Sequence, residues 1–223
     1  MIEWPTPPAH LAGGIGSGDF WQTGNAIVGL TMAFAGLHPH DRVLDVGCGL
    51  GRVAARSPSI PSAFAFITSL YNPSGAIRAE DFAFPWSDGA FTVAIASSIF
   101  THLPPLATSN YLRQIARTLE SGGRLFSSFF VLDDESRQLV RTRVTDPAFT
   151  TAFAEGMYAD RSTAEGAVAF DAQWLADTLK SAGFIFDSFI PDAGASRPVR
   201  CTRTSSSRDG RCSARVARFS SLH

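Results

Sequence analysis

Three glycines at alternate positions form the most distinctive chemical feature of the sequence. Gly47, Gly49 and Gly51 lie in the string DVGCGLGR, which Asp45 opens. Glycine adopts positive φ angles and lets a ligand approach the backbone where a Cβ would clash. The string follows an apolar run, residues 42–46, and the helix expected after it would offer free N–H groups and a positive dipole end. This order predicts a nucleotide or nucleoside site at the carboxyl end of a first strand, and a glycine-rich turn without a ligand is the alternative.

A second group of polar residues follows another apolar run, residues 91–97. Ser97 and Ser98 stand at its end, where Ser98 either hydrogen-bonds a ligand or satisfies the local backbone. His102 follows and is a weak catalytic candidate as a general base, the alternative being a histidine that packs at the entry of a helix. Cys48, inside the glycine string, is predicted to be a buried small hydrophobe rather than a reactive thiol.

Helical and strand patterns alternate along the chain and would position these residues. The expected helices span 19–35, 105–119 and 172–182, and the expected strands span 42–46, 91–97, 124–132 and 184–190. Asp19 and Asp171 are predicted N-caps, and Gly36 and Gly183 are predicted helix ends. The side chains expected to face the core are Ala26, Ile27, Leu30, Thr31 and Phe34 on the first helix, and Leu106, Leu112, Ile115 and Leu119 on the second. The alternation implies an α/β fold, a Rossmann-like, doubly wound and mostly parallel sheet with helices on both faces.

Charge is distributed unevenly along the chain. The 223 residues have a formal net charge of −1, but residues 196–223 contain seven arginines and one acid, and the remainder has a net charge of −7. We therefore expect an irregular lead-in over 1–18, one domain over 19–195, and a basic, disordered tail over 196–223. Because the tail has neither interleaved aromatics nor a helical period, nucleic-acid binding is not expected.

Composition excludes several classes of protein. No apolar stretch approaches the length of a membrane span, and the opening MIEWPTPPAH lacks the features of a secretory signal. The three cysteines have neither the spacing of a metal site nor that of a disulfide framework. We expect a cytoplasmic protein without a metal site, and oligomeric state is not predicted.

Several strings resemble class I S-adenosylmethionine-dependent methyltransferases of bacteria. DVGCGLGR is similar to motif I of that family, DFAFPWSDGAFTVAIASSIFTHL to the approach to its fourth strand and the segment after it, and YLRQIARTLESGGRLFSSFF to its next helix, turn and fifth strand. The turn in the last string is expected at 121–123. The resemblance covers roughly residues 12–195 and implies that S-adenosyl-L-methionine is the cofactor.

The same resemblance assigns roles to individual residues. Gly47, Gly49 and Gly51 would lie beneath the methionine and ribose parts of the cofactor, with Cys48 lending only its backbone. Asp45 would orient the amino-acid end of the cofactor. The adenine contact would come from Glu80 or Asp81, and Ser97 and Ser98 would line the cleft. Residues 133–166 look like an insertion that covers the site.

Two departures from the family pattern bear on function. The acidic residue that should bind the ribose hydroxyls is missing, and an internal deletion is expected near 57–70 where the second strand should lie. The basic tail is also expected to replace the last strand of the family, which leaves the expected sheet incomplete. The leading hypothesis is methyl transfer to an unidentified small-molecule substrate. The alternatives are a truncated, catalytically silent relative and an NAD-binding oxidoreductase, which the glycine spacing disfavours.

Overall fold

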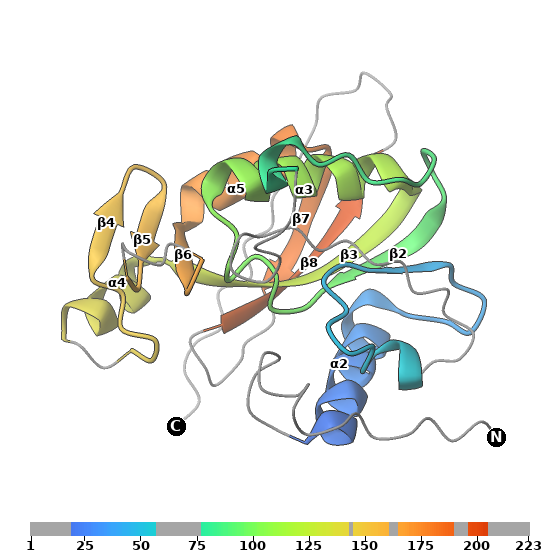
Figure 1. Cartoon of the computed structure of the whole chain (residues 1–223), viewed down its shortest axis with the longest axis horizontal. Helices are drawn as coiled ribbons and strands as arrows, with labels where there is room; N and C mark the ends of the chain where they lie inside the picture. Colours follow the sequence, from blue (N-terminus) through green and yellow to red (C-terminus); the bar gives the residue numbers. More distant parts are fainter. Residues whose placement is uncertain (1–18, 57–76, 143–144, 161–164, 190–195, 205–223) are drawn as a thin grey trace.

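A mixed β-sheet forms the centre of the molecule, with helices on both faces (Figure 1). The structure is a computed structural model that describes residues 19–56, 77–142, 145–160, 165–189 and 196–204. The strands follow the order β1-β2-β3-β6-β5-β4, and β8 pairs with both β3 and β7. Their bounds are β1 Val43–Asp45, β2 Phe91–Ala96, β3 Leu119–Leu132, β4 Thr151–Phe153, β5 Gly156–Tyr158, β6 Val168–Asp171, β7 Phe184–Phe189 and β8 Ser196–Arg203. The helices are α2 Phe20–Ala35, α3 Pro105–Thr118, α4 Asp134–Arg141 and α5 Ala172–Ser181, with short 3-10 turns η1 Ala54–Arg56 and η2 Ala79–Asp81.

The parallel part of the sheet confirms the predicted fold class. β1, β2, β3 and β6 pair in parallel, and Asp45 of β1 stands opposite Ile95 of β2. Both faces of β1 and β2 are covered, so nearly every side chain of these strands is buried. Burial on both faces is why the two segments are continuous apolar runs rather than alternating ones. Aligned parallel strands bring the ends of β1 and β2, and therefore the predicted site residues, to one edge of the sheet.

Helix caps lie where the sequence places them. The Asp19 carboxylate accepts a hydrogen bond from Gln22 N at the start of α2, and Gly36 ends that helix with φ of 60°. Asp171 caps α5 in the same way, accepting from the backbone N–H groups of Gln173 and Trp174. Caps depend on a few adjacent residues, so local sequence is sufficient to predict them.

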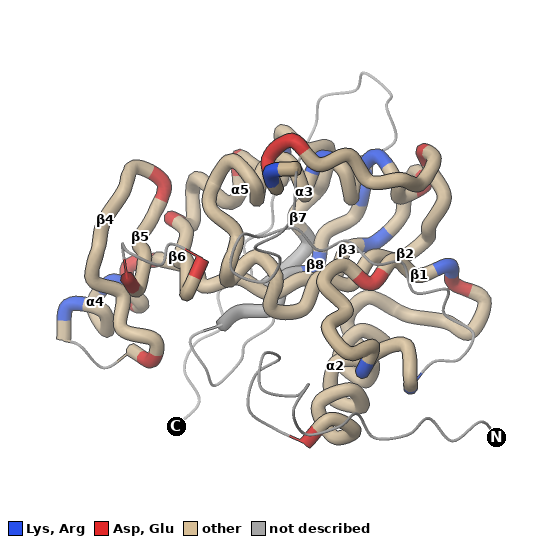
Figure 2. Tube along the Cα trace, in the orientation of Figure 1, with Lys and Arg blue, Asp and Glu red and all other residues tan. Residues whose placement is uncertain are grey.

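The expected inward faces of α2 and α3 are partly wrong. On α2, Thr31 is buried and Ile27 packs against the core as predicted, whereas Ala26, Leu30 and Phe34 are exposed. The other buried residues of α2 are Gly24 and Ala35. α2 contains no charged residue (Figure 2). Without a charged face, the sequence pattern does not show which of its apolar residues point to the core. On α3, Leu112, Ile115 and the following Leu119 are buried as predicted, whereas Leu106 is 70% exposed. Leu106 lies on the same helix face as the exposed Arg113, two turns later.

The turn expected after α3 is corrected. β3 already begins at Leu119, which pairs with Phe91, so residues 121–123 belong to a strand rather than to a separate turn. The ladder shifts register between Phe91 and Val93, and this irregularity absorbs the extra residues around Gly122, whose φ is 77°.

The larger correction concerns the expected tail. Residues 196–203 form β8, which pairs antiparallel with β3 from Ser196 opposite Phe130 to Thr202 opposite Arg124. The chain therefore has a last strand, and the domain does not end at 195. β8 provides hydrogen-bond partners for the backbone groups along one edge of β3. Cys201 of β8 is fully buried in the main core. Residues 205–223, the lead-in 1–18 and the deletion expected near 57–70 lie outside the described residues.

The chain between β3 and β6 contains a helix and a hairpin, in the segment 133–166 that is expected to be an insertion covering the site. α4 and the β4–β5 hairpin lie here, and the hairpin joins β6 (Figure 1). β6 pairs with Phe130–Leu132, beyond the point where β2 ends, and Val168 N donates to Thr101 O at 2.8 Å. β6, β5 and β4 thus continue the sheet past the loop that follows β2.

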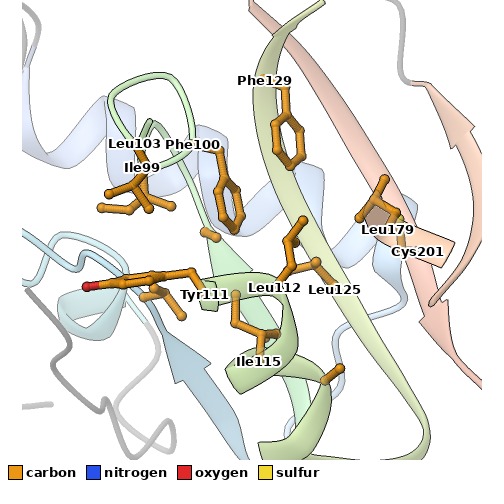
Figure 3. Packing of buried hydrophobic residues seen from close by; sticks show 14 of the residues in the cluster. Ile99, Phe100, Leu103, Tyr111, Leu112, Ile115, Leu125, Phe129, Leu179 and Cys201 are labelled. Atoms are coloured by element: carbon orange, nitrogen blue, oxygen red, sulfur yellow. The ribbon is translucent and has the colours of Figure 1, made fainter. Parts of the chain in front are cut away.

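A chain of four aromatic side chains packs beside the predicted site. Phe100 stacks on Phe129 with ring centroids 4.7 Å apart, and Phe129 meets Phe170 edge-on at 6.4 Å (Figure 3). Phe170 in turn stacks on Trp174 of α5 at 4.8 Å. These contacts tie the loop after β2 to β3, β6 and α5, so the edge that carries the predicted site rests on a well-packed core.

Candidate functional site

Asp45 is the most unusual ionisable group of the described residues. It ends β1, is only 2% exposed, and its Oδ2 has no hydrogen-bond partner within the described part of the chain. Burial raises the pKa of Asp45 to about 7, against the attraction of the Arg52 guanidinium, which lowers it. A buried acceptor without a partner is costly to a fold, and such groups are typical of functional sites.

The glycine string forms a tight turn directly after β1. Val46 N donates to Ile95 O at 2.8 Å, which continues the ladder, and Gly51 N then donates to Cys48 O at 2.9 Å. The φ angles are 72° at Gly47, 55° at Gly49 and 79° at Gly51, a conformation that favours glycine at all three positions. A Cβ at Gly47 would lie 2.8 Å from Ile99 Cδ1, whereas one at Gly51 would meet no atom within 4 Å. The turn is therefore closed on the side of Ile99 and open at Gly51.

A helix is expected after the glycines, and the described residues that follow them, which end at Arg56, contain the 3-10 turn η1. α2 packs closely on this segment, since a Cβ at Gly24 would lie 2.5 Å from Arg52 O. The Arg56 guanidinium lies over the Trp21 ring at 4.3 Å. α2 therefore supports the glycine turn from the side of the sheet that it covers.

Cys48 has the environment of a buried hydrophobe. Its side chain is 5% exposed and its Sγ lies 3.6 Å from Gly49 O. Burial, with a further contribution from the Asp45 charge, raises the pKa of the Cys48 thiol to about 12. Because the thiolate is the reactive form, this environment disfavours nucleophilic chemistry at Cys48.

Ser97 and Ser98 form the turn that follows β2, at the same edge of the sheet as Asp45. Ser97 is half-buried and Ser98 is exposed. Ser98 N donates to Ser128 Oγ of β3 at 2.8 Å, and Ser98 has φ of 56°, the only positive value for a non-glycine residue in the described chain. The chain then returns to the glycine turn through Ile99.

His102 lies one turn beyond Ile99, with its backbone N–H donating to Ile99 O at 3.1 Å. Its Nδ1 is 2.9 Å from Glu165 O. A carbonyl oxygen only accepts hydrogen bonds, so Nδ1 carries the proton, and Nε2 is the ring nitrogen of the neutral imidazole that can take one up. The ring thus joins the loop after β2 to the segment that leads into β6.

Glu80 and Asp81 lie in η2, which α3 holds in place. Asn110 Nδ2 donates to Ala79 O at 3.0 Å and to Phe82 O at 2.9 Å. Glu80 is paired with Arg78, and its pKa is lowered by a hydrogen bond from its own backbone N–H and by that guanidinium. Asp81 is exposed. α3 thus holds the backbone on both sides of the two acids, and Arg78 holds the Glu80 side chain. Asp45, Ser97, Ser98 and His102 are the predicted residues that lie with the glycines at one edge of the sheet.

Sequence interpretation missed one residue that supports this edge. Ser128 is a common side chain in an apolar run, and nothing in the local pattern marks it. Arg52 directly follows the last glycine of the string, and its charge attracts the Asp45 carboxylate. A basic residue at this position could have been predicted to interact with Asp45.

Other kinds of site are not seen in the described ranges. They contain no group of three or more His, Cys, Asp or Glu side chains placed to hold a metal ion. No described helix is long and apolar enough to cross a membrane.

Comparison with solved structures shows the fold. A methyltransferase dependent on S-adenosylmethionine from Methanosarcina mazei matches with a TM-score of 0.52 at 18% identity, covering 78% of this chain and 97% of that one. The 1,6-didemethyltoxoflavin N1-methyltransferase of Burkholderia thailandensis, solved with S-adenosylhomocysteine, matches with a TM-score of 0.53 at 18% identity over 83% and 80% of the two chains. The [4+2]-cyclase SpnF matches with a TM-score of 0.54 at 16% identity over 82% of each. No protein-family model matches the sequence.

The chain therefore has the class I methyltransferase fold. The candidate site, a glycine turn and a buried carboxylate at the ends of β1 and β2, lies at the edge where ligands bind in open α/β sheets. At these identities the likeness concerns the fold alone, and the cyclase among the neighbours illustrates that one fold serves more than one reaction.

Proposed function

We propose that the chain binds S-adenosylmethionine at the Asp45–Gly51 turn and transfers its methyl group to a small-molecule acceptor. The observation that carries this proposal is the buried Asp45 carboxylate, whose Oδ2 lacks a partner in the described structure beside a turn built from three positive-φ glycines. A ligand with a cationic, hydrogen-bond-donating end would satisfy that oxygen, and the amino-acid end of S-adenosylmethionine has this chemistry.

The residues of the chain then have separate roles. Asp45 would hold the cationic end of the cofactor, and the glycine turn would let its body approach the backbone. Ser97 and Ser98 would line the cleft, and Glu80 or Asp81 would contact the adenine. When bound, the cofactor supplies a methyl group on a positively charged sulfur that is already activated for transfer. The main task of the protein is therefore to align the acceptor and exclude water.

The competing proposal is a catalytically silent relative with weak or no cofactor binding. Residues 57–76 contain no carboxylate, so the ribose acid expected from the family is missing from this part of the chain. Losing a charged hydrogen-bond partner weakens binding by about 1.5–3 kcal/mol. Asp45 and the glycine turn argue for retained binding. A silent relative would transfer no methyl group, whether or not it still binds the cofactor.

Calorimetric titration with S-adenosylhomocysteine tests the proposal, with Gly47→Ala as the diagnostic variant. We expect micromolar binding by the wild type and at least about tenfold weaker binding by Gly47→Ala, because alanine at φ of 72° is strained and its Cβ would meet Ile99. Gly29→Ala is the matched control, since Gly29 lies on α2 and a Cβ there meets nothing within 4 Å. No binding by the wild type at millimolar ligand would favour the silent relative, and equal binding by Gly47→Ala would remove the site assignment.

His102 is proposed as the group that accepts the acceptor's proton when the nucleophile is a hydroxyl or an amine. The contact between Nδ1 and Glu165 O predicts the Nδ1–H tautomer. Nitrogen NMR of 15N-histidine-labelled protein, recorded with the ring in its neutral form, should show a protonated Nδ1 and an unprotonated Nε2, with the signals assigned by their loss in His102→Asn. Asparagine keeps an N–H donor near the position of Nδ1, so the variant should retain its fold. A protonated Nε2 would contradict the assignment.

A further inference from the structure

Ser98 has a backbone conformation that its residue type does not favour. Its φ of 56° is in the left-handed region, which costs a residue with a Cβ about 1 kcal/mol or more. Such conformations persist where the surrounding structure holds them, and they cluster at functional sites. Ser98 follows β2 at the edge where Asp45 ends β1, so its strain lies at the candidate site.

The contact that holds Ser98 comes from a different strand. Ser98 N donates to Ser128 Oγ at 2.8 Å, across 30 residues of sequence. Ser128 lies on β3, immediately after the residue that pairs with Ala96, and is 8% exposed. A buried side chain on a central strand has little freedom to move, so the hydroxyl is a fixed anchor for the turn.

The left-handed residue sets the direction in which the chain leaves β2. Directly after Ser98, Ile99 is buried against the glycine turn, and its Cδ1 occupies the space beside Gly47. Ile99 and Leu103 lie next to each other in Figure 3 and both belong to the main core cluster, so Ile99 is held on its core side as well. The hydroxyl of Ser128 therefore connects to the glycine turn through Ser98 and Ile99.

Resting on the proposed function, we propose that Ser128 is a positioning residue for the cofactor site. It holds Ser98 in the left-handed conformation, and this conformation seats Ile99 against Gly47 and closes one side of the glycine turn. Ser128 makes no contact with the ligand in this proposal. Removing the Ser128 hydroxyl therefore lowers ligand affinity only to the extent that Ser98 needs this hydrogen bond to keep its left-handed conformation.

A thermodynamic cycle separates this role from a merely structural one. We expect Ser128→Ala to weaken S-adenosylhomocysteine binding about tenfold, and Ser128→Thr, which keeps the hydroxyl, to restore most of the affinity. Glycine adopts positive φ without support. In a Ser98→Gly background, Ser128→Ala should therefore change affinity by less than about twofold. Thermal melts of all variants identify any that fail to fold.

The conformation of Ser98 is measured separately, without ligand. Backbone chemical shifts and the HN–Hα coupling of Ser98 should report positive φ in the wild type and in Ser128→Thr, and a changed φ in Ser128→Ala. Unchanged φ and unchanged affinity in Ser128→Ala would overturn the proposal, as would an equal loss of affinity in both backgrounds. Failure of the wild type to bind S-adenosylhomocysteine would instead overturn the proposed function, and with it any role of Ser128 in cofactor binding.

Discussion

Asp45→Asn is expected to stabilise the protein above neutral pH and to weaken cofactor binding at the same time. The Asp45 carboxylate is buried, its Oδ2 has no partner in the described chain, and burial raises its pKa to about 7. Ionising it inside the fold is unfavourable, and asparagine resembles the protonated form in shape without being able to ionise. The same exchange removes the charge proposed to hold the cationic end of the ligand.

The sign of the pH dependence follows from linkage. The folded state holds the Asp45 proton up to about pH 7, whereas the unfolded chain releases it near the ordinary value of 3.8. Between these values the folded state binds more protons, so the contribution of Asp45 to stability is fully present below 3.8 and is lost as pH rises through about 7. The Asp45→Asn variant would not show this loss. Above pH 7 the variant should gain on the order of 2–4 kcal/mol, or roughly 5 °C or more in melting temperature.

Melting curves of both proteins at pH 5 and pH 8.5 measure the effect as a difference between variant and wild type. The difference should be larger at the higher pH. Affinity for S-adenosylhomocysteine, measured by calorimetry at pH 8.5, should fall by about tenfold to a hundredfold, the value of a charge-assisted hydrogen bond. A variant that is less stable at pH 8.5 would show that Asp45 has a structural partner, and unchanged affinity would remove it from the site.

Features set by neighbouring residues are those that sequence predicts well. The positive φ angles of the glycine turn and the caps at Asp19, Gly36 and Asp171 depend on a few adjacent residues, and all lie where expected. That β1 and β2 are buried strands also follows from their apolar runs, because strands covered on both faces are continuously apolar.

Features that depend on distant partners could not be predicted in this way. β8 lies in an arginine-rich segment of low apolar content, and it is a strand because the free edge of β3 pairs with it. Ser128 supports Ser98 from another strand, and serine is too common to mark such a role. In each case the deciding interaction joins segments that are far apart in sequence, so composition and period carry no signal of it.

Arg124 is expected to be the most important polar side chain for stability, at the opposite end of the sheet from the site. From β3, its Nη1 donates to Ala35 O at 2.7 Å and to Gly36 O, and its Nη2 donates to both Asp41 carboxylate oxygens at 2.8 and 3.0 Å. The Arg124 and Asp41 side chains are 21% and 10% exposed. One guanidinium thus satisfies the carbonyls at the end of α2 and neutralises a largely buried carboxylate.

Asp41 is bound on its other sides as well. It accepts from Thr92 Oγ1 at 2.6 Å and from His38 N at 2.7 Å. Its pKa is lowered: burial alone would raise it, but these hydrogen bonds and the Arg124 charge outweigh burial. A carboxylate with a lowered pKa contributes stability above its unfolded value, and that contribution is lost as pH falls through the folded value. The network is therefore intact at neutral pH.

Arg124→Met should lower the free energy of unfolding by about 3 kcal/mol, because it leaves the Asp41 charge without its cation and the α2 carbonyls without a donor. Denaturant titration at pH 7 measures this loss, and Arg113→Met is the matched control, since Arg113 is exposed on α3 and should change stability by less than about 0.5 kcal/mol. Adding Asp41→Asn to Arg124→Met should recover part of the loss, because the uncompensated charge is then gone. Equal effects of the two arginine variants would mean that α2 is held to the sheet by apolar contacts alone.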